Sequence, residues 1–185
     1  MVTKAPIPEL LAPAGSLDAV RAAVANGANA VYCGASKFNA RDDGAQLTLD
    51  ELEQACAIAH ERGARIYLTL NILIKPAELI EALEYLGECI DRGVDAAIVQ
   101  DVGLIRCIQQ VYPDFEIHGS TQLTVHDAAG ARVMERLGST AWCSRARTPW
   151  PTSAPSTRPC RGSGSRPSCM ARSASRIQGS ATCRG

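Results

Sequence analysis

Seven polar residues follow short apolar segments of this chain and could together bind or react with a substrate. They are Arg41 after AVYCG, Asn71 at the end of RIYLTLN, Gln100 and Asp101 after AAIV, and His118, Ser120 and Gln122 within HGSTQ. Guanidinium, amide, imidazole, hydroxyl and carboxylate groups can hold a polar substrate and move protons. Turn formation or helix capping would explain any one of them alone. Their recurrence after successive apolar segments favours a site.

The spacing of apolar residues predicts the elements that carry this polar set. We expect strands within residues 8–15, 30–34, 65–71, 96–100 and 116–120, and helices within 16–27, 48–63, 76–93, 101–113 and 126–138. Ser16 is expected to cap the first helix, and Thr48 with Glu51 forms a capping-box pattern in the second. Pro76 suits the first turn of the third helix.

Strands that alternate with helices over short connections predict a parallel sheet. The length of the repeat favours an α/β fold of the TIM type, an incomplete (β/α)8 barrel made of its first five β/α units; a doubly wound sheet is the alternative. Active sites of such barrels lie at the C-terminal ends of the strands. We therefore expect the seven polar residues to line one cavity at that rim.

The three histidines are assigned different places. His60 is expected on the surface of a helix, and His126 is expected to cap or start the fifth helix. His118 lies late in the fifth strand, where a role at the rim and an ordinary place in the barrel interior are equally open.

The single cysteines Cys33, Cys56, Cys89 and Cys107 stand in apolar or helical contexts and are expected to be buried as small apolar residues.

The sequence lacks the characteristic motifs of several protein classes. GxSxG and HExxH, the patterns of serine hydrolases and zinc proteases, are both absent from the chain. No secretory signal and no apolar run of membrane-spanning length is seen. We therefore expect a cytoplasmic protein that does not enter a membrane.

The composition changes abruptly near Thr140. Residues 1–140 carry 11 basic and 19 acidic side chains, whereas residues 141–185 carry eight arginines, no lysine and no acid. The overall net charge of zero therefore hides an acidic part and a basic part. A basic tail that binds RNA nonspecifically, in a protein without enzymatic activity, is one interpretation. Because no lysine and no RNA-binding motif accompanies the arginines, we disfavour it.

Four segments carry a resemblance to a known family. PELLAPAGSLDAVRAAVANGANAVYCG, YLTLNILIK, AAIVQDVGLIR and EIHGSTQLTVHDAAGARVMERLG occur in this order within residues 7–138. Together they resemble the N-terminal part of the peptidase U32 family. The resemblance implies a barrel protein with a cysteine cluster beyond the fifth unit. It also implies an enzyme, either a protease or a hydroxylase of RNA bases or of a quinone precursor that uses a 4Fe-4S cluster.

A reading-frame change would explain the tail. Codons compatible with residues 141–185 can be chosen so that the neighbouring frame reads RVVLA, TLADIRAIHTAV and LETFVHGALCISYSGQC, which restores two expected elements and a U32-like cysteine signature. We therefore expect two regions, an N-terminal barrel part over 1–140 and an out-of-frame, disordered tail over 141–185. The truncated chain would be inactive and prone to self-association, with no metal site and no cofactor of its own. Its intact relative would carry the cluster and act on RNA or peptide.

Overall fold

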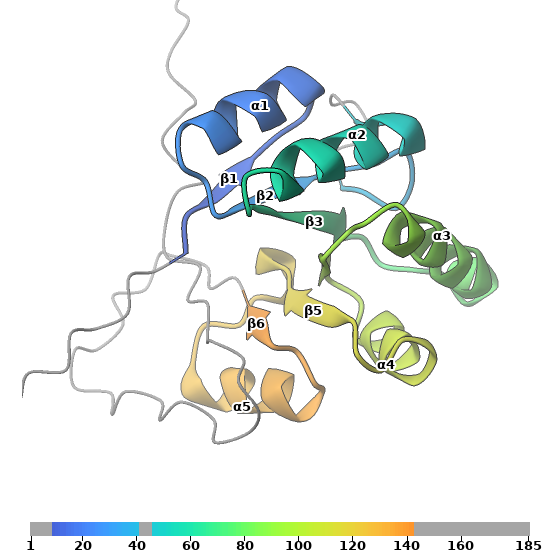
Figure 1. Cartoon of the computed structure of the whole chain (residues 1–185). Helices are drawn as coiled ribbons and strands as arrows, with labels where there is room; N and C mark the ends of the chain where they lie inside the picture. Colours follow the sequence, from blue (N-terminus) through green and yellow to red (C-terminus); the bar gives the residue numbers. More distant parts are fainter. Residues whose placement is uncertain (1–8, 41–45, 143–185) are drawn as a thin grey trace, which may run out of the picture.

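Six parallel strands form one sheet in the computed structural model, which describes residues 9–40 and 46–142 (Figure 1). The strands are β1 (Leu11–Pro13), β2 (Ala30–Cys33), β3 (Arg65–Leu70), β4 (Ala96–Val99), β5 (Glu116–Gly119) and β6 (Ala141–Trp142). Each pairs with the next in sequence order, so the sheet runs β1-β2-β3-β4-β5-β6. This order confirms the α/β fold expected from the sequence. It differs from a doubly wound sheet, whose strand order reverses part-way.

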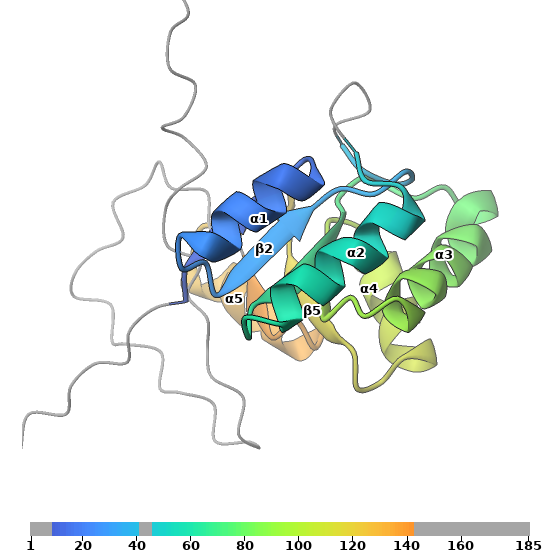
Figure 2. The same ribbon diagram turned by 45° about the horizontal axis from the view of Figure 1, so that its top comes forward.

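Five helices follow the strands and lie along one face of the curved sheet (Figures 1 and 2). They are α1 (Leu17–Ala25), α2 (Leu49–His60), α3 (Leu79–Asp91), α4 (Val102–Val111) and α5 (Ala128–Arg136), with short 3-10 turns η1 (Pro76–Glu78) and η2 (Thr121–Leu123). We call the face under the helices the outer face and the opposite one the inner face. Helices on one face only, with strands in sequence order, are the arrangement of a (β/α)8 barrel seen over part of its circumference.

Local sequence signals set the helix ends. The Ser16 side chain accepts a hydrogen bond from the amide of Ala19, and Thr48 with Glu51 forms the full capping box. Pro76 opens the 3-10 turn η1 rather than α3 itself. His126 was expected to cap or start the fifth helix. The cap is Asp127, because its carboxylate accepts the Gly130 amide at 2.7 Å and an imidazole is a poorer acceptor there.

The sixth strand departs from the predicted boundary. Residues from Ala141 onward were expected to leave the fold, but Ala141 pairs with His118, and Trp142 pairs with Gly119. The Thr140 amide donates to the carbonyl of Ile117 at 2.9 Å and so brings the chain alongside β5. These two residues thus form backbone pairs with the edge of β5 that β4 leaves unpaired. The rest of the predicted tail, 143–185, lies outside the described residues.

The two faces of the sheet have separate apolar clusters. Outward side chains of the strands pack under the helices with Val20, Leu52, Leu86 and Leu104, all fully buried. The inner-face cluster is small: Ala30, Tyr67, Ala96 and Ile98. Within residues 9–40 and 46–142, no helix combines the length and hydrophobicity needed to cross a bilayer.

The cysteine prediction holds for three of its four residues. Cys33, Cys56 and Cys89 are buried, and Cys107 is half-buried. Burial raises the pKa of the Cys33 and Cys56 thiols to about 12 and that of Cys89 to about 11. These thiols therefore stay protonated at neutral pH and act as apolar residues.

Candidate functional site

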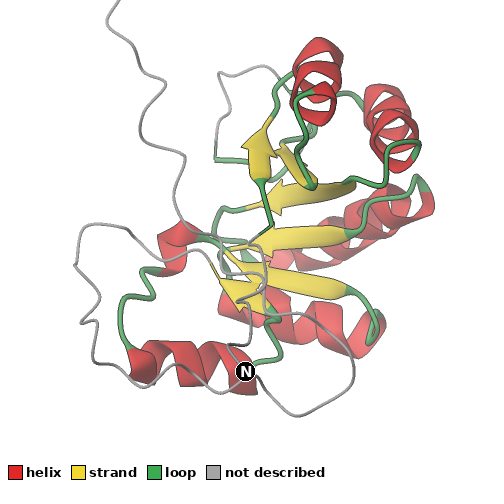
Figure 3. Cartoon of the chain, turned by 60° about the vertical axis from the view of Figure 1, so that its left-hand side comes forward, coloured by secondary structure: helices red, strands yellow, loops and turns green. Residues whose placement is uncertain are grey.

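The strands of the sheet run parallel, so their C-terminal ends lie on the same side of it (Figure 3). Predicted site residues follow β3, β4 and β5 at this C-terminal edge. Asn71 directly follows β3, Gln100 and Asp101 follow β4, and Ser120 and Gln122 follow β5. Because β3, β4 and β5 are parallel neighbours, their C-terminal ends lie side by side, and the residues that follow them are close together at this C-terminal edge. Arg41 lies outside the described residues. Whether the set binds a substrate stays a prediction.

Asp101 holds two segments of this edge. Its Oδ1 accepts the amide of Leu104 at 2.9 Å and caps α4, and its Oδ2 accepts the amide of Ile74 at 3.2 Å. Each carboxylate oxygen therefore has a backbone partner. The geometry fits a positioning residue, which fixes the segment after β3 against the start of α4, better than a free acid or base.

The loop after β2 is fastened over the same edge. The amide of Ala40 donates to Asn71 Oδ1 at 3.1 Å. Thr69, on β3, donates its hydroxyl to Asn39 Oδ1 at 3.3 Å and to the carbonyl of Cys33 at 3.1 Å. Asn39 and Thr69 are both buried. Sequence reasoning missed this pair, because a lone Asn in a loop and a Thr within a strand carry no signal of a shared contact.

Close packing and strain accompany this loop. A Cβ atom at Gly34 would overlap the side-chain amide of Asn39, so the close approach requires glycine there. Phe38 has a φ of 58°, a costly conformation for an aromatic residue. Its ring lies edge-on to Tyr85, with 5.9 Å between ring centroids. Hydrogen bonds and ring packing thus hold the described end of this loop, up to Ala40.

The remaining edge residues are partly engaged. Ser120 is buried, and its Oγ accepts the amide of Gln122 at 3.3 Å. The Gln100 amide donates to the carbonyl of Leu70 at 3.4 Å, and its side chain is half-buried. Gln122 is exposed. Of the described candidates, Gln122 is the one whose side chain is most open to solvent.

His118 lies within the inner face, below the edge. Its ring is fully buried, and Nε2 forms a hydrogen bond with Glu116 Oε1 at 2.7 Å. The ring also packs edge to face against Tyr67, with 4.7 Å between ring centroids. Glu116 starts β5 and Tyr67 is in the middle of β3, so both contacts lie away from the C-terminal ends. Of the two places left open by the sequence, the structure favours the barrel interior.

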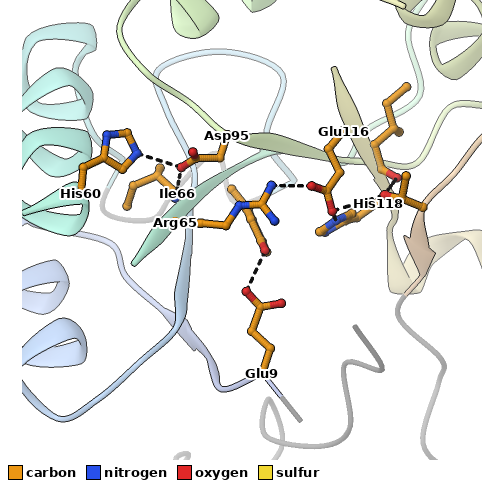
Figure 4. A network of polar contacts seen from close by, with 10 residues as sticks. Glu9, His60, Arg65, Ile66, Asp95, Glu116 and His118 are labelled. Atoms are coloured by element: carbon orange, nitrogen blue, oxygen red, sulfur yellow. Dashed lines mark hydrogen bonds and ion pairs between the residues drawn. The ribbon is translucent and has the colours of Figure 1, made fainter. Parts of the chain in front are cut away.

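His118 belongs to a polar network across the inner face, made of Glu9, Arg65, Tyr67, Glu116 and His118 (Figure 4). Arg65 forms an ion pair with Glu116, and its guanidinium lies 5.1 Å from the centroid of the Tyr67 ring. The Tyr67 hydroxyl donates to Glu9 at 3.0 Å. The hydrogen bond from His118 and the ion pair with Arg65 lower the pKa of Glu116 to about 2. Glu116 is therefore a carboxylate at neutral pH.

His60 has a structural contact as well as a surface position. Its Nε2 lies 3.0 Å from Asp95 Oδ2, and the same oxygen accepts the amide of Ile66 at 2.7 Å. The pair therefore joins the end of α2 to the loop before β4 and to β3 (Figure 4). The side chain is 42% exposed, which fits the predicted helix surface.

The described residues do not fit an iron–sulfur cluster. Among residues 9–40 and 46–142, no three His, Cys, Asp or Glu side chains are grouped so as to hold a metal ion. Cluster ligands are thiolates, and burial keeps Cys33, Cys56 and Cys89 protonated. No step that uses a cluster is derived for these residues.

Comparison with known proteins decides the family. The sequence profile of Peptidase family U32 matches residues 15–143, more than half of the chain. The chain belongs to peptidase family U32. A solved structure of a U32 peptidase has the same fold, with a TM-score of 0.59, 18% identity, and coverage of 78% of this chain and 61% of that one. A putative phosphonomutase from Burkholderia cenocepacia shares the fold at a TM-score of 0.53 and 14% identity, covering 69% of this chain and 55% of the other.

Curated relatives match this U32 chain over similar lengths, between 131 and 140 residues. The 23S rRNA 5-hydroxycytidine C2501 synthase of Escherichia coli is 36% identical over 71% of this chain and 20% of its own length. The tRNA hydroxylation protein P1 of Bacillus subtilis is 36% identical over 71% of this chain and 31% of its own. An uncharacterized protease of Methanocaldococcus jannaschii is 30% identical over 76% and 34%. The chain thus spans between a fifth and about a third of these relatives.

Proposed function

We propose that this chain is the first part of a U32 barrel whose intact form hydroxylates bases in RNA. The observation that carries the proposal is the similarity, at 36% identity, to a 23S rRNA hydroxycytidine synthase and a tRNA hydroxylation protein across the stretch that builds the C-terminal edge. In this proposal the edge holds an RNA base. Asn71 and Gln122 contact it, and Asp101 and Asn39 keep the surrounding loops in place.

Proteolysis is the second candidate, because the family is named for it and one relative carries the name of a protease. Its usual machinery pairs a nucleophilic Ser or Cys with a histidine base. In the described part of the chain, His118 Nε2 is bound to Glu116 and Nδ1 has no hydrogen-bond partner, so no Ser or Cys is paired with this imidazole. The buried cysteines have raised pKa values. These contacts favour the RNA hydroxylase over the protease.

We further propose that the chain as it stands is inactive because its reading frame changes after Thr140. Support comes from the composition, which loses all acidic residues at this point, and from the U32 match, which ends at residue 143. A basic tail that binds RNA without catalysis remains the alternative. Translating the gene in the neighbouring frame after codon 140 distinguishes the frame change from the basic RNA-binding tail. A neighbouring frame without a U32-like continuation would overturn the frame change.

The enzymatic proposal is tested on a version with one C inserted after codon 140. We expect it to restore hydroxylated nucleosides, measured by mass spectrometry of digested RNA, in a host whose own U32 proteins are deleted. The unaltered chain of 185 residues is the matched control and should restore no hydroxylated nucleoside. Cleavage of peptides by the restored protein, with RNA left unmodified, would favour the protease instead.

A further inference from the structure

One ring nitrogen of His118 has no partner. Nδ1 is buried and makes no hydrogen bond, although the other nitrogen, Nε2, is firmly held by Glu116. A buried polar atom without a partner destabilises the folded state, so such atoms are rare in native proteins. An atom of this kind calls for a partner, which is either a buried water or a ligand that binds there.

The neighbours of His118 fix what Nδ1 can do. Glu116 is ionised and can only accept, so the proton of a neutral imidazole is on Nε2. Nδ1 then presents a lone pair. Arg65 holds the second oxygen of Glu116, and Tyr67 holds the ring edge to face, so neither the carboxylate nor the imidazole is free to turn. This is the arrangement in which a carboxylate orients a histidine for the group on its far side.

The environment makes this acceptor strong and selective. Ile98 pairs with His118 across β4 and β5, and Tyr67 covers the ring from β3. Both are buried in the inner-face cluster or beside it, so bulk water does not compete for Nδ1. In such a low-dielectric place a hydrogen bond is stronger than in water, and a group without a donor is rejected.

We propose that His118 Nδ1 accepts a hydrogen bond from an N–H group of the RNA base that enters the inner face from the C-terminal edge. His118 lies on β5, two residues before Ser120, so it would form the end wall of that site. Glu116 and Arg65 are positioning residues that act through His118. This inference rests on the proposed function and names the base edge that the site reads.

The first measurement follows the His118 nitrogens by 15N NMR in the full chain. We expect the ring proton on Nε2, which donates to Glu116, and a lone pair on Nδ1. Adding uridine, whose ring N3–H is a donor, should shift Nδ1, while 3-methyluridine, which lacks that donor, should bind about tenfold more weakly and leave Nδ1 unchanged. Equal responses to the two nucleosides, no response to either, or a protonated Nδ1 in the free chain would overturn the proposal.

Two substitutions separate a contact with the base from a structural role. His118→Gln retains a donor that reaches Glu116 but has no acceptor at the Nδ1 position, whereas His118→Asn retains a polar atom near Nδ1 and loses the Glu116 contact. If Nδ1 contacts the base, discrimination between uridine and 3-methyluridine is lost in the Gln variant and retained in part by the Asn variant. If His118 is merely structural, both variants retain the discrimination, and their melting temperatures report folding independently.

The outcome is distinct from that of the proposed function. If the frame-restored protein hydroxylates RNA and the His118→Gln version does so with unchanged kcat/KM, the base contact is wrong and the function stands. If Nδ1 responds to uridine but no hydroxylated nucleoside forms in the restored protein, the base contact stands and the reaction is wrong.

Discussion

The guanidinium of Arg65 on β3 reaches past β4 to the carboxylate of Glu116 on β5, over the buried side chain of Ala96. Ala96 pairs with Glu116 on one side and with Tyr67 on the other. Ala30 has the corresponding place on β2, where it pairs with Arg65. Ala30 on β2 and Ala96 on β4 thus leave room beside the large side chains of Arg65, Tyr67 and Glu116 on the odd strands. Layers filled from alternate strands are a feature of (β/α)8 barrels.

Ala96→Leu should break this network. The added methyl groups would occupy the space that the Arg65 and Tyr67 side chains use, and overpacking of a filled interior costs about 1–3 kcal/mol. Urea unfolding measures the loss of stability. Ala22→Leu, at an exposed position of α1, is the matched control and should change stability by less than about 0.5 kcal/mol. Equal effects of the two substitutions would contradict the layer argument.

Acid should weaken the fold through Glu116. Its pKa is lowered from the ordinary value of 4.5 to about 2 in the folded chain. A lowered folded-state pKa contributes stability that is present above 4.5 and is lost as the pH falls through 2. Glu116→Gln should therefore flatten the stability profile in this window. A profile as steep as that of the parent chain would show that other carboxylates dominate.

Asp101→Ala should loosen two segments at once. Loss of the α4 cap costs about 0.5–2 kcal/mol, and the Ile74 amide loses its acceptor as well. Hydrogen exchange should accelerate at both Leu104 and Ile74. Asp127→Ala is the control, because it removes a comparable cap from α5 without a second tether. Slow exchange at Ile74 in the Asp101 variant would argue against the positioning role.

Gly34→Ala should displace the loop after β2. The new methyl group would overlap the Asn39 side chain, and this would separate Asn39 from Thr69. We expect a loss of about 1–3 kcal/mol. Gly34→Ala combined with Asn39→Ala removes the overlap, so the double variant should lose less than the sum of the single losses. Additive losses would mean that the two residues do not meet in solution.

The two outer strands should make the chain self-associate. β1 and β6 each pair on one side only within the described residues, and Leu10, beside β1, is 51% exposed. Open edges with apolar neighbours promote association between chains. Analytical ultracentrifugation should show a mass that rises with concentration, and limited trypsin digestion should first cut at the arginines within 145–184. A monomer at all concentrations, with those arginines protected, would overturn both the open-edge and the tail predictions.

The local pattern of the sequence was enough for the elements and their order. Alternating apolar segments, the Thr48–Glu51 capping box and the Ser16 cap depend on residues close in the chain, and each is found as expected. The residues at the C-terminal edge could be named for the same reason, since each follows its own strand. The partners of these residues could not be named, because they come from distant segments.

Tertiary structure decided which polar groups meet. Arg65 and Glu116 are 51 residues apart, and Thr69 and Asn39 are 30 apart, so only the register of the sheet brings them together. The register also decided the place of His118, because inward orientation on β5 puts its ring against Tyr67 and Glu116 instead of at the rim. The sixth strand was missed for a related reason. A segment of two residues is too short to show an alternation of apolar and polar side chains, and its hydrogen-bond partners on β5 lie more than 20 residues earlier in the chain.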